Sequence, residues 1–216
     1  MIEFDSNIRR LPVYLLLDCS GSMSGEPIEA VRQGIQHLLS ELRGDPNALE
    51  TVWLSVVTFD SVARQVVPLT ELMAFQEPVL QASGTTALGA ALRLLSQQIE
   101  VEVRRSTPTQ KGDWRPLVFL MTDGNPTDDW EEAADDLKRR RPGTVVACGA
   151  GSGVDRENLR RITDSVVMLQ DYAPDTFRAF FAWVSASVMT TSQKIVAEPN
   201  DLDGLPAPPP EIEVIR

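Results

Sequence analysis

The chain has 216 residues, of which 43% are hydrophobic and 24% charged, a composition typical of one globular domain with a well-buried core. Its 31 acidic and 20 basic residues give a net charge of -11, which disfavours nucleic-acid binding because such binding depends on neutralising phosphates with Lys and Arg. One histidine excludes a zinc site built from several histidines, and two cysteines argue against a disulfide framework.

Apolar periodicity alternates along the chain between strand-like and helix-like segments, the pattern of a parallel sheet covered by helices. The helix-like segments repeat apolar residues every three or four positions. In chain order we expect a strand over 12–18, a helix over 27–43, strands over 52–60 and 63–69, a helix from 88 to at least 99, a strand over 117–122, a helix over 128–140, a strand over 144–148, a helix over 155–163, a strand over 166–169 and a helix over 174–189.

The second and third of these strands are joined at Asp60-Ser61, a connection too short for a crossover. They should therefore pair as an antiparallel hairpin, with the third strand at the edge of the sheet, where Pro68 is tolerated. The sequence predicts a doubly wound, Rossmann-like α/β fold. Its six-stranded, mostly parallel sheet should have one antiparallel edge strand and helices on both faces.

Residues 1–190 are expected to form this domain, and residues 191–216 a Pro-rich tail that is extended or disordered. The tail has lost the apolar periodicity, and its five prolines exclude a helix or a central strand. No segment approaches the roughly 20 apolar residues that would span a bilayer, and residues 1–10 lack the apolar core of a signal peptide. With so few cysteines, a reducing cytoplasm is the compartment we expect.

The run Asp18-Cys19-Ser20-Gly21-Ser22 places one carboxylate and two hydroxyls where the first strand ends. Alternation along the turn lets Asp18, Ser20 and Ser22 face the same way, and turns Cys19 into the protein as a buried, inert thiol. Any strand-to-helix turn could use Asp, Ser and Gly, so this run alone does not decide between a turn and a cation site.

Two other loops are expected to meet this turn. Asp123 follows the strand over 117–122, and Thr85 and Thr86 precede the helix that begins at 88. Loops that leave the carboxyl ends of strands at a switch point of a doubly wound sheet face one crevice. Two carboxylates with several hydroxyls suit an octahedral Mg²⁺ that keeps some of its waters, and they are few charges for a Ca²⁺ cage.

These residues closely resemble the von Willebrand factor A-type domain and its metal-ion-dependent adhesion site, whose pattern is Asp-x-Ser-x-Ser, a distant Thr and a distant Asp. The family's threonine lies in Gly-Gly-Thr-x-x-Gly-x-Ala-Leu, a spacing that Thr86 matches; Thr85 stands where the family has its second Gly. The family's aspartate lies in the tripeptide Thr-Asp-Gly, and Asp123 lies in the same tripeptide here. The resemblance covers residues 11–189 and implies five metal ligands: Asp18, Ser20, Ser22, Thr86 and Asp123.

Segments that begin at Leu15, Gln110 and Thr122 are similar to the stand-alone bacterial A-domain proteins associated with tellurite resistance, the TerY-like group. This resemblance implies a cytoplasmic interaction module in a stress-response system with phosphatase-like and kinase-like partners. It does not imply that the chain is an enzyme or binds tellurite. The resemblance to the A-type domain family implies that the bound Mg²⁺ or Mn²⁺ keeps one coordination position open for an Asp or Glu of a partner.

Two other functions stay open at this point. A Mg²⁺-dependent phosphohydrolase could use Asp18 as nucleophile. Such enzymes require a second acidic residue two positions after the nucleophile, and this chain has Ser20 there. The chain has no Gly-x-x-x-x-Gly-Lys-Ser/Thr loop and no Gly-x-Ser-x-Gly elbow. A metal-independent scaffold would use Asp18 and Asp123 only as turn or cap residues. We expect a binding module that is not an enzyme.

Overall fold

The computed structural model describes residues 9–194 and 205–215. Its seven-stranded sheet has the order β3-β2-β1-β4-β5-β6-β7. The five inner strands are parallel, and β3 and β7 pair antiparallel to them at the two edges. The strands are β1 (Leu11–Asp18), β2 (Val52–Phe59), β3 (Ala63–Glu71), β4 (Leu117–Thr122), β5 (Thr144–Ala150), β6 (Val166–Leu169) and β7 (Ile212–Ile215).

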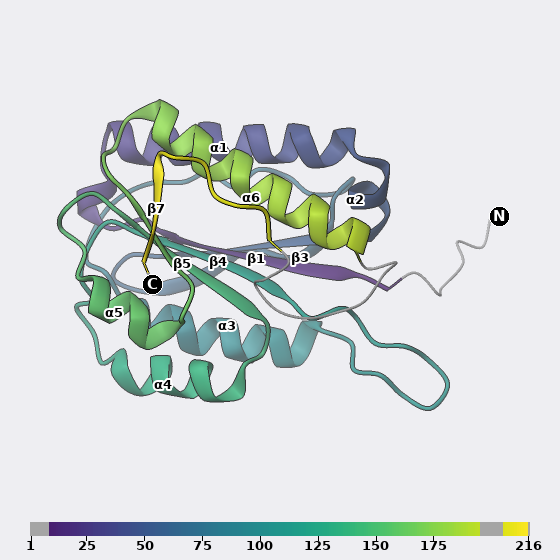
Figure 1. The fold of residues 1–216 in the computed structure, drawn as a ribbon. Helices are drawn as coiled ribbons and strands as arrows, with labels where there is room; N and C mark the ends of the chain where they lie inside the picture. Colours follow the sequence, from purple (N-terminus) through teal and green to yellow (C-terminus); the bar gives the residue numbers. More distant parts are fainter. Residues whose placement is uncertain (1–8, 195–204, 216) are drawn as a thin grey trace.

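Helices cover both faces of this sheet, with α1, α2 and α6 on one side and α3, α4 and α5 on the other (Figure 1). Alternate residues of β1 therefore enter different cores: Leu15 packs with α1 and α6, and Leu16 with α3 and α4. The expected doubly wound α/β fold is confirmed. The helices are α1 (Glu26–Gly44), α2 (Pro46–Thr51), α3 (Leu88–Glu102), α4 (Glu131–Arg140), α5 (Arg156–Ile162) and α6 (Pro174–Lys194).

The sheet has one strand more than the six expected. β7 begins only after the last proline of the C-terminal segment, so each of its residues can use its backbone N–H, and it pairs with β6 from Leu169↔Ile212 to Val166↔Ile215. The segment before it also packs on the domain, because Trp183 Nε1 donates a hydrogen bond to the carbonyl oxygen of Pro206 at 2.8 Å. Residues 195–204 of the expected tail lie outside the described residues.

The described part of the chain contains no helix long and apolar enough to cross a membrane. Its largest helix, α6, buries the aromatic rings of Phe177, Phe180 and Phe181 in the core instead. The amphipathic character of the helices is thus explained by packing against the sheet.

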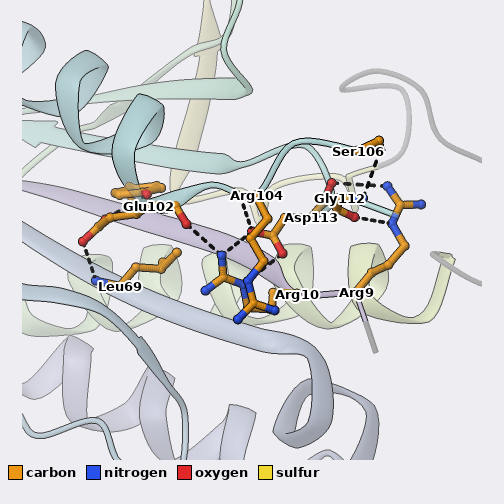
Figure 2. Close-up of polar contacts among 9 residues, drawn as sticks. Arg9, Arg10, Leu69, Glu102, Arg104, Ser106, Gly112 and Asp113 are labelled. Atoms are coloured by element: carbon orange, nitrogen blue, oxygen red, sulfur yellow. Dashed lines mark hydrogen bonds and ion pairs between the residues drawn. The ribbon is translucent and has the colours of Figure 1, made fainter. Parts of the chain in front are cut away.

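A polar cluster lies at the amino-terminal edge of the parallel strands (Figure 2). Arg10, just before β1, donates from Nε to Asp113 Oδ1 at 2.9 Å and from Nη2 to Oδ2 at 2.5 Å. The same Nη2 donates to the carbonyl oxygen of Glu102 at 2.7 Å, and the guanidinium lies 4.6 Å from the centre of the Trp53 ring. The carboxylate of Glu102 accepts hydrogen bonds from Tyr14, Gln65 and the backbone N–H of Leu69. These contacts hold the starts of β1 and β4 at fixed positions.

The contact between α1 and α6 depends on the absence of a side chain at Gly34. A Cβ there would lie 2.0 Å from Cδ2 of Phe181, whose ring is buried. We expect Gly34→Ala to lower the free energy of unfolding by about 1–3 kcal/mol through overpacking, although alanine favours a helix. Gly44→Ala at the end of α1, where a Cβ would meet nothing within 4 Å, is the control and should not destabilise. Chemical denaturation measures both, and equal effects would contradict the close contact.

Candidate metal centre

The carboxyl ends of β1 and β4 lie side by side at the centre of the sheet, with Leu17 in register with Met121. From β1 the chain proceeds through β2 and β3 to one edge, and from β4 it proceeds to the other. This is the switch point at which ligands bind in doubly wound sheets. Asp18 is the last residue of β1, and Asp123 directly follows β4.

The turn after β1 is fixed by hydrogen bonds to the carboxylate of Asp18. Its Oδ1 accepts from the backbone N–H of Ser20 at 2.8 Å, and its Oδ2 accepts from the hydroxyl of Thr122 at 2.5 Å. The backbone N–H of Gly21 donates to the carbonyl oxygen of Gly84 at 3.0 Å, which brings the loop before α3 against the same turn.

A chain of hydroxyl and carboxylate groups crosses from one strand end to the other. Ser20 Oγ and Ser22 Oγ are 3.0 Å apart, and Ser22 Oγ donates to Asp123 Oδ1 at 2.7 Å. Ser20 is buried, whereas Ser22 is exposed, so the cluster is open to solvent on the Ser22 side. The expected alternation of Asp18, Ser20 and Ser22 on one side of the turn agrees with these contacts.

Thr86 reaches the same place from the loop before α3. A Cβ added at Gly124 would lie 3.6 Å from Thr86 Oγ1 and 3.9 Å from Ser22 Oγ, so both hydroxyls border the turn after β4. The backbone of Thr86 is held by Thr127, whose Oγ1 accepts from the Thr86 N–H at 3.1 Å and whose N–H donates to the Thr86 carbonyl at 2.9 Å. All five candidate residues therefore lie together.

Thr85 points elsewhere, although it is adjacent in sequence. Its backbone N–H and its hydroxyl both contact Ser61 Oγ, at 3.1 and 3.3 Å, and its side chain is exposed. The preceding Gly84 has a φ of +73°, which lets the loop turn Thr86 inward and Thr85 outward. The geometry agrees with the choice of Thr86 rather than Thr85 as a site residue.

The two carboxylates of the cluster are buried, and no basic side chain of the described residues pairs with them. Asp18 is 1% exposed and Asp123 5%. Burial raises the pKa of both carboxyls, and for Asp18 the negative charge of Asp123 raises the pKa further. Hydrogen bonds from Ser20, Thr122 and Ser22 act in the opposite direction. Two buried acids beside three hydroxyls form a set of hard oxygen donors to which a divalent cation could bind.

The described residues contain no group of three or more His, Cys, Asp or Glu that could hold a metal ion. Soft or imidazole-bound metals thus have no site of that kind in this part of the chain. Cys19 lies between the site residues but is buried on the opposite side of the turn, and burial raises the pKa of its thiol to about 12. The expected burial of Cys19 is confirmed, and the raised pKa disfavours the reactive thiolate form. Its inertness stays a prediction.

The sequence predicts a helix over 128–140 and does not indicate the role of Asp128. The helix begins at Glu131 instead, because the Asp128 carboxylate accepts hydrogen bonds from the backbone N–H groups of Gly89 and Ala90, both at 2.9 Å. Asp128 thereby caps α3 from another loop and holds the segment that carries Thr86. A capping residue 38 positions away from the helix start leaves no local capping signal in the sequence.

Comparison with known protein families identifies the family to which the chain belongs. The model of the von Willebrand factor type A domain matches residues 13–178, most of the chain. The chain belongs to the von Willebrand factor type A family. Domains of this family, VWA domains, are generally interaction modules rather than enzymes, and divalent metal binding at their adhesion-site motif is found among them.

Three known proteins that are similar to this VWA domain are longer than it. An uncharacterized protein of Synechocystis sp. is 31% identical over 213 residues, which cover 89% of this chain and 46% of that protein. The structure of a von Willebrand factor type A protein from Catenulispora acidiphila is 21% identical with a TM-score of 0.61, covering 84% of this chain and 43% of that one. Proximal thread matrix protein 1 from the mussel byssus, solved with a zinc-occupied MIDAS motif, is 17% identical with a TM-score of 0.62, covering 85% and 48%. The chain spans less than half the length of each, and the two structures establish the fold alone.

Proposed function

We propose that Asp18, Ser20, Ser22, Thr86 and Asp123 bind one divalent cation, Mg²⁺ or Mn²⁺. The observation that carries this proposal is the pair of buried carboxylates whose pKa values are raised and which no basic side chain of the described residues neutralises. A cation would replace this unfavourable burial of negative charge with a favourable contact. Hard oxygen donors with only two charges favour Mg²⁺ or Mn²⁺ over a dedicated Ca²⁺ site.

The cation would serve to bind another protein. Three of the five ligands are neutral hydroxyls, so the metal keeps an attraction for a further carboxylate. Ser22 is exposed, so the open side of the site faces solvent. An Asp or Glu of a partner would complete the coordination there. The zinc-occupied site of the mussel protein, a member of the same fold class, supports a metal at this position of the fold.

The sequence segments shared with the TerY-like group carry the rest of the proposal. We place the chain in the cytoplasm, in a tellurite-resistance or stress-response system, with phosphatase-like and kinase-like proteins as partners. This placement rests on the resemblance of the segments at Leu15, Gln110 and Thr122. It is independent of the metal chemistry and is tested separately, by the identity of the captured partners.

A phosphohydrolase that uses Asp18 as nucleophile fits the geometry less well. Both carboxylate oxygens of Asp18 accept hydrogen bonds, and the residue is buried, so an attacking oxygen would first have to break a contact to Ser20 or Thr122. The position two residues on is held by a serine rather than an acid. Phosphatase turnover with Mg²⁺ that disappears in Asp18→Ala would reverse this preference.

Thermal melting tests the cation site directly. At a Mg²⁺ or Mn²⁺ concentration 100 times the dissociation constant, binding to the native state should add about 2.7 kcal/mol of stability, or roughly 5–11 °C in Tm for a domain of this size. Thr86→Ala should lose most of this shift. Thr85→Ala, the neighbouring threonine that faces Ser61, should keep it. A wild-type protein that shows no shift at millimolar metal would support the metal-independent scaffold.

The binding role needs a second experiment. We expect affinity capture from the native host to recover partners with Mg²⁺ present and to lose them with EDTA or in Asp18→Ala. Acidic residues on the partner should then be required for capture. Equal recovery with and without EDTA would contradict a metal-bridged interaction, even if the cation site itself is real.

A further inference from the structure

A second polar site lies at the opposite end of the sheet from the metal centre. A hollow of about 190 Å³ opens between the end of α4, the start of β5 and the turn after α5. Three cationic side chains and one acidic side chain line it, so its formal charge is positive in a chain whose net charge is -11. They are Arg115, Lys138, Arg141 and Asp164. We refer to it as the basic hollow.

Backbone contacts hold the arginines of the basic hollow in place. The N–H of Thr144 donates to the carbonyl oxygen of Pro116 at 2.8 Å, and Arg115 Nη2 donates to the carbonyl oxygen of Arg141 at 3.2 Å. A Cβ at Gly143 would lie 2.2 Å from the Pro116 carbonyl oxygen, so the two segments are in close contact. The wall that carries both arginines is therefore pre-formed, which lowers the entropic cost of binding.

Arg141 has an unusual backbone conformation. Its φ is +46°, and among the described residues it is the only non-glycine residue with a positive φ. This position ends α4, where glycine is the common residue because a side chain is strained in the left-handed region. Strain of this kind is concentrated at functional sites. An arginine where glycine would be more stable points to a use for the guanidinium.

The cations of the basic hollow are only partly neutralised. Lys138 Nζ donates to the carbonyl oxygen of Arg160 at 2.9 Å and to Asp164 Oδ1 at 2.7 Å. Within the described part of the chain, the guanidinium of Arg141 makes no hydrogen bond, and its charge helps Lys138 to lower the pKa of Asp164. The Asp164 side chain is 79% exposed and can turn into solvent when another anion approaches.

We propose that the basic hollow binds a phosphate dianion, either inorganic phosphate or the phosphate monoester of a phosphorylated side chain. Arg115, Lys138 and Arg141 would surround its oxygens, and the hydroxyls of Thr144 and Ser165, which also line the hollow, would donate further hydrogen bonds. The charges match, because three cations and one carboxylate leave an excess of two positive charges. The site needs no divalent metal and is independent of the function proposed for the metal centre.

Phosphate binding is measured by calorimetry and by ³¹P NMR on the full chain in EDTA, which excludes any contribution of the metal centre. Arg141→Gly is the decisive variant, because glycine relieves the backbone strain and should keep or raise Tm. We expect it to weaken binding of inorganic phosphate at least about tenfold, as loss of a charged hydrogen-bond donor does. Arg139→Ala, which removes an exposed arginine outside the hollow, should change binding less than about twofold.

The source of the phosphate is resolved by a second titration, with a phosphoserine peptide. Tighter binding of the peptide than of inorganic phosphate assigns the hollow to a phosphorylated partner, and equal binding assigns it to free phosphate. This titration is also done in EDTA, which separates this site from the metal centre. The proposal is overturned if the wild type and Arg141→Gly bind phosphate equally, or if the wild type binds none.

Discussion

Asp113→Ala is expected to lower the free energy of unfolding by about 3–5 kcal/mol, because it leaves the charge of Arg10 buried without its carboxylate. The side chains of Arg10 and Asp113 are 10% and 2% exposed. Asp113 also accepts a hydrogen bond from the backbone N–H of Arg104 at 2.8 Å, which would be lost. The carbonyl oxygen of Glu102 and the ring of Trp53 would remain as partners of Arg10, but neither carries a negative charge.

Chemical denaturation of three variants distinguishes a buried pair from a surface pair. Arg32→Ala, which breaks the half-exposed pair with Glu29, should cost no more than about 1 kcal/mol. The double replacement Arg10→Met with Asp113→Leu should cost less than Asp113→Ala alone, since it leaves no uncompensated charge. A loss for Asp113→Ala as small as that for Arg32→Ala would show that water reaches Arg10.

The pairing of Arg10 with Asp113 illustrates what the sequence could not predict. The two residues are 103 positions apart, and each has at least one other charged residue within two positions of it, so no pattern marks this pair rather than another. The short helix α2 and the strand β7 were missed for a related reason. α2 has only six residues, too few to display helical periodicity, and β7 follows a Pro-rich segment and forms only because the edge of β6 is available to it.

The candidate site was predictable because its residues follow strongly patterned strands. β4 has the bounds that its apolar run indicated, and β1 ends at Asp18 as expected, so the turns after them could be placed by counting. The switch point then brought Asp18 and Asp123 together without any knowledge of side-chain contacts. Counting could not provide the groups that position these residues. Thr122 holds Asp18 across the ends of β4 and β1, and Thr127 and Asp128 hold the segment that carries Thr86 from another loop.

Asp18→Asn is expected to abolish the stabilisation by Mg²⁺ or Mn²⁺ and, without metal, to make the protein at least as stable as the wild type. Burial disfavours the charged form of Asp18, and the nearby charge of Asp123 disfavours it further. A neutral amide of the same shape removes both costs. Its oxygen can accept from the N–H of Ser20, and its NH₂ can donate to the hydroxyl of Thr122, which can itself donate to the carbonyl oxygen of Gly124, now 3.3 Å away.

The stability curves of the two proteins should therefore cross as metal is added. In EDTA the variant equals or exceeds the wild type, and at 100 times the wild-type dissociation constant the wild type gains about 2.7 kcal/mol that the variant does not. A purely structural role for Asp18 gives the opposite result, since the variant would then be less stable at every metal concentration and the difference would not depend on metal. Because the two roles differ in the sign of the effect in EDTA, denaturation with and without Mn²⁺ decides between a cation site and an ordinary turn at the end of β1.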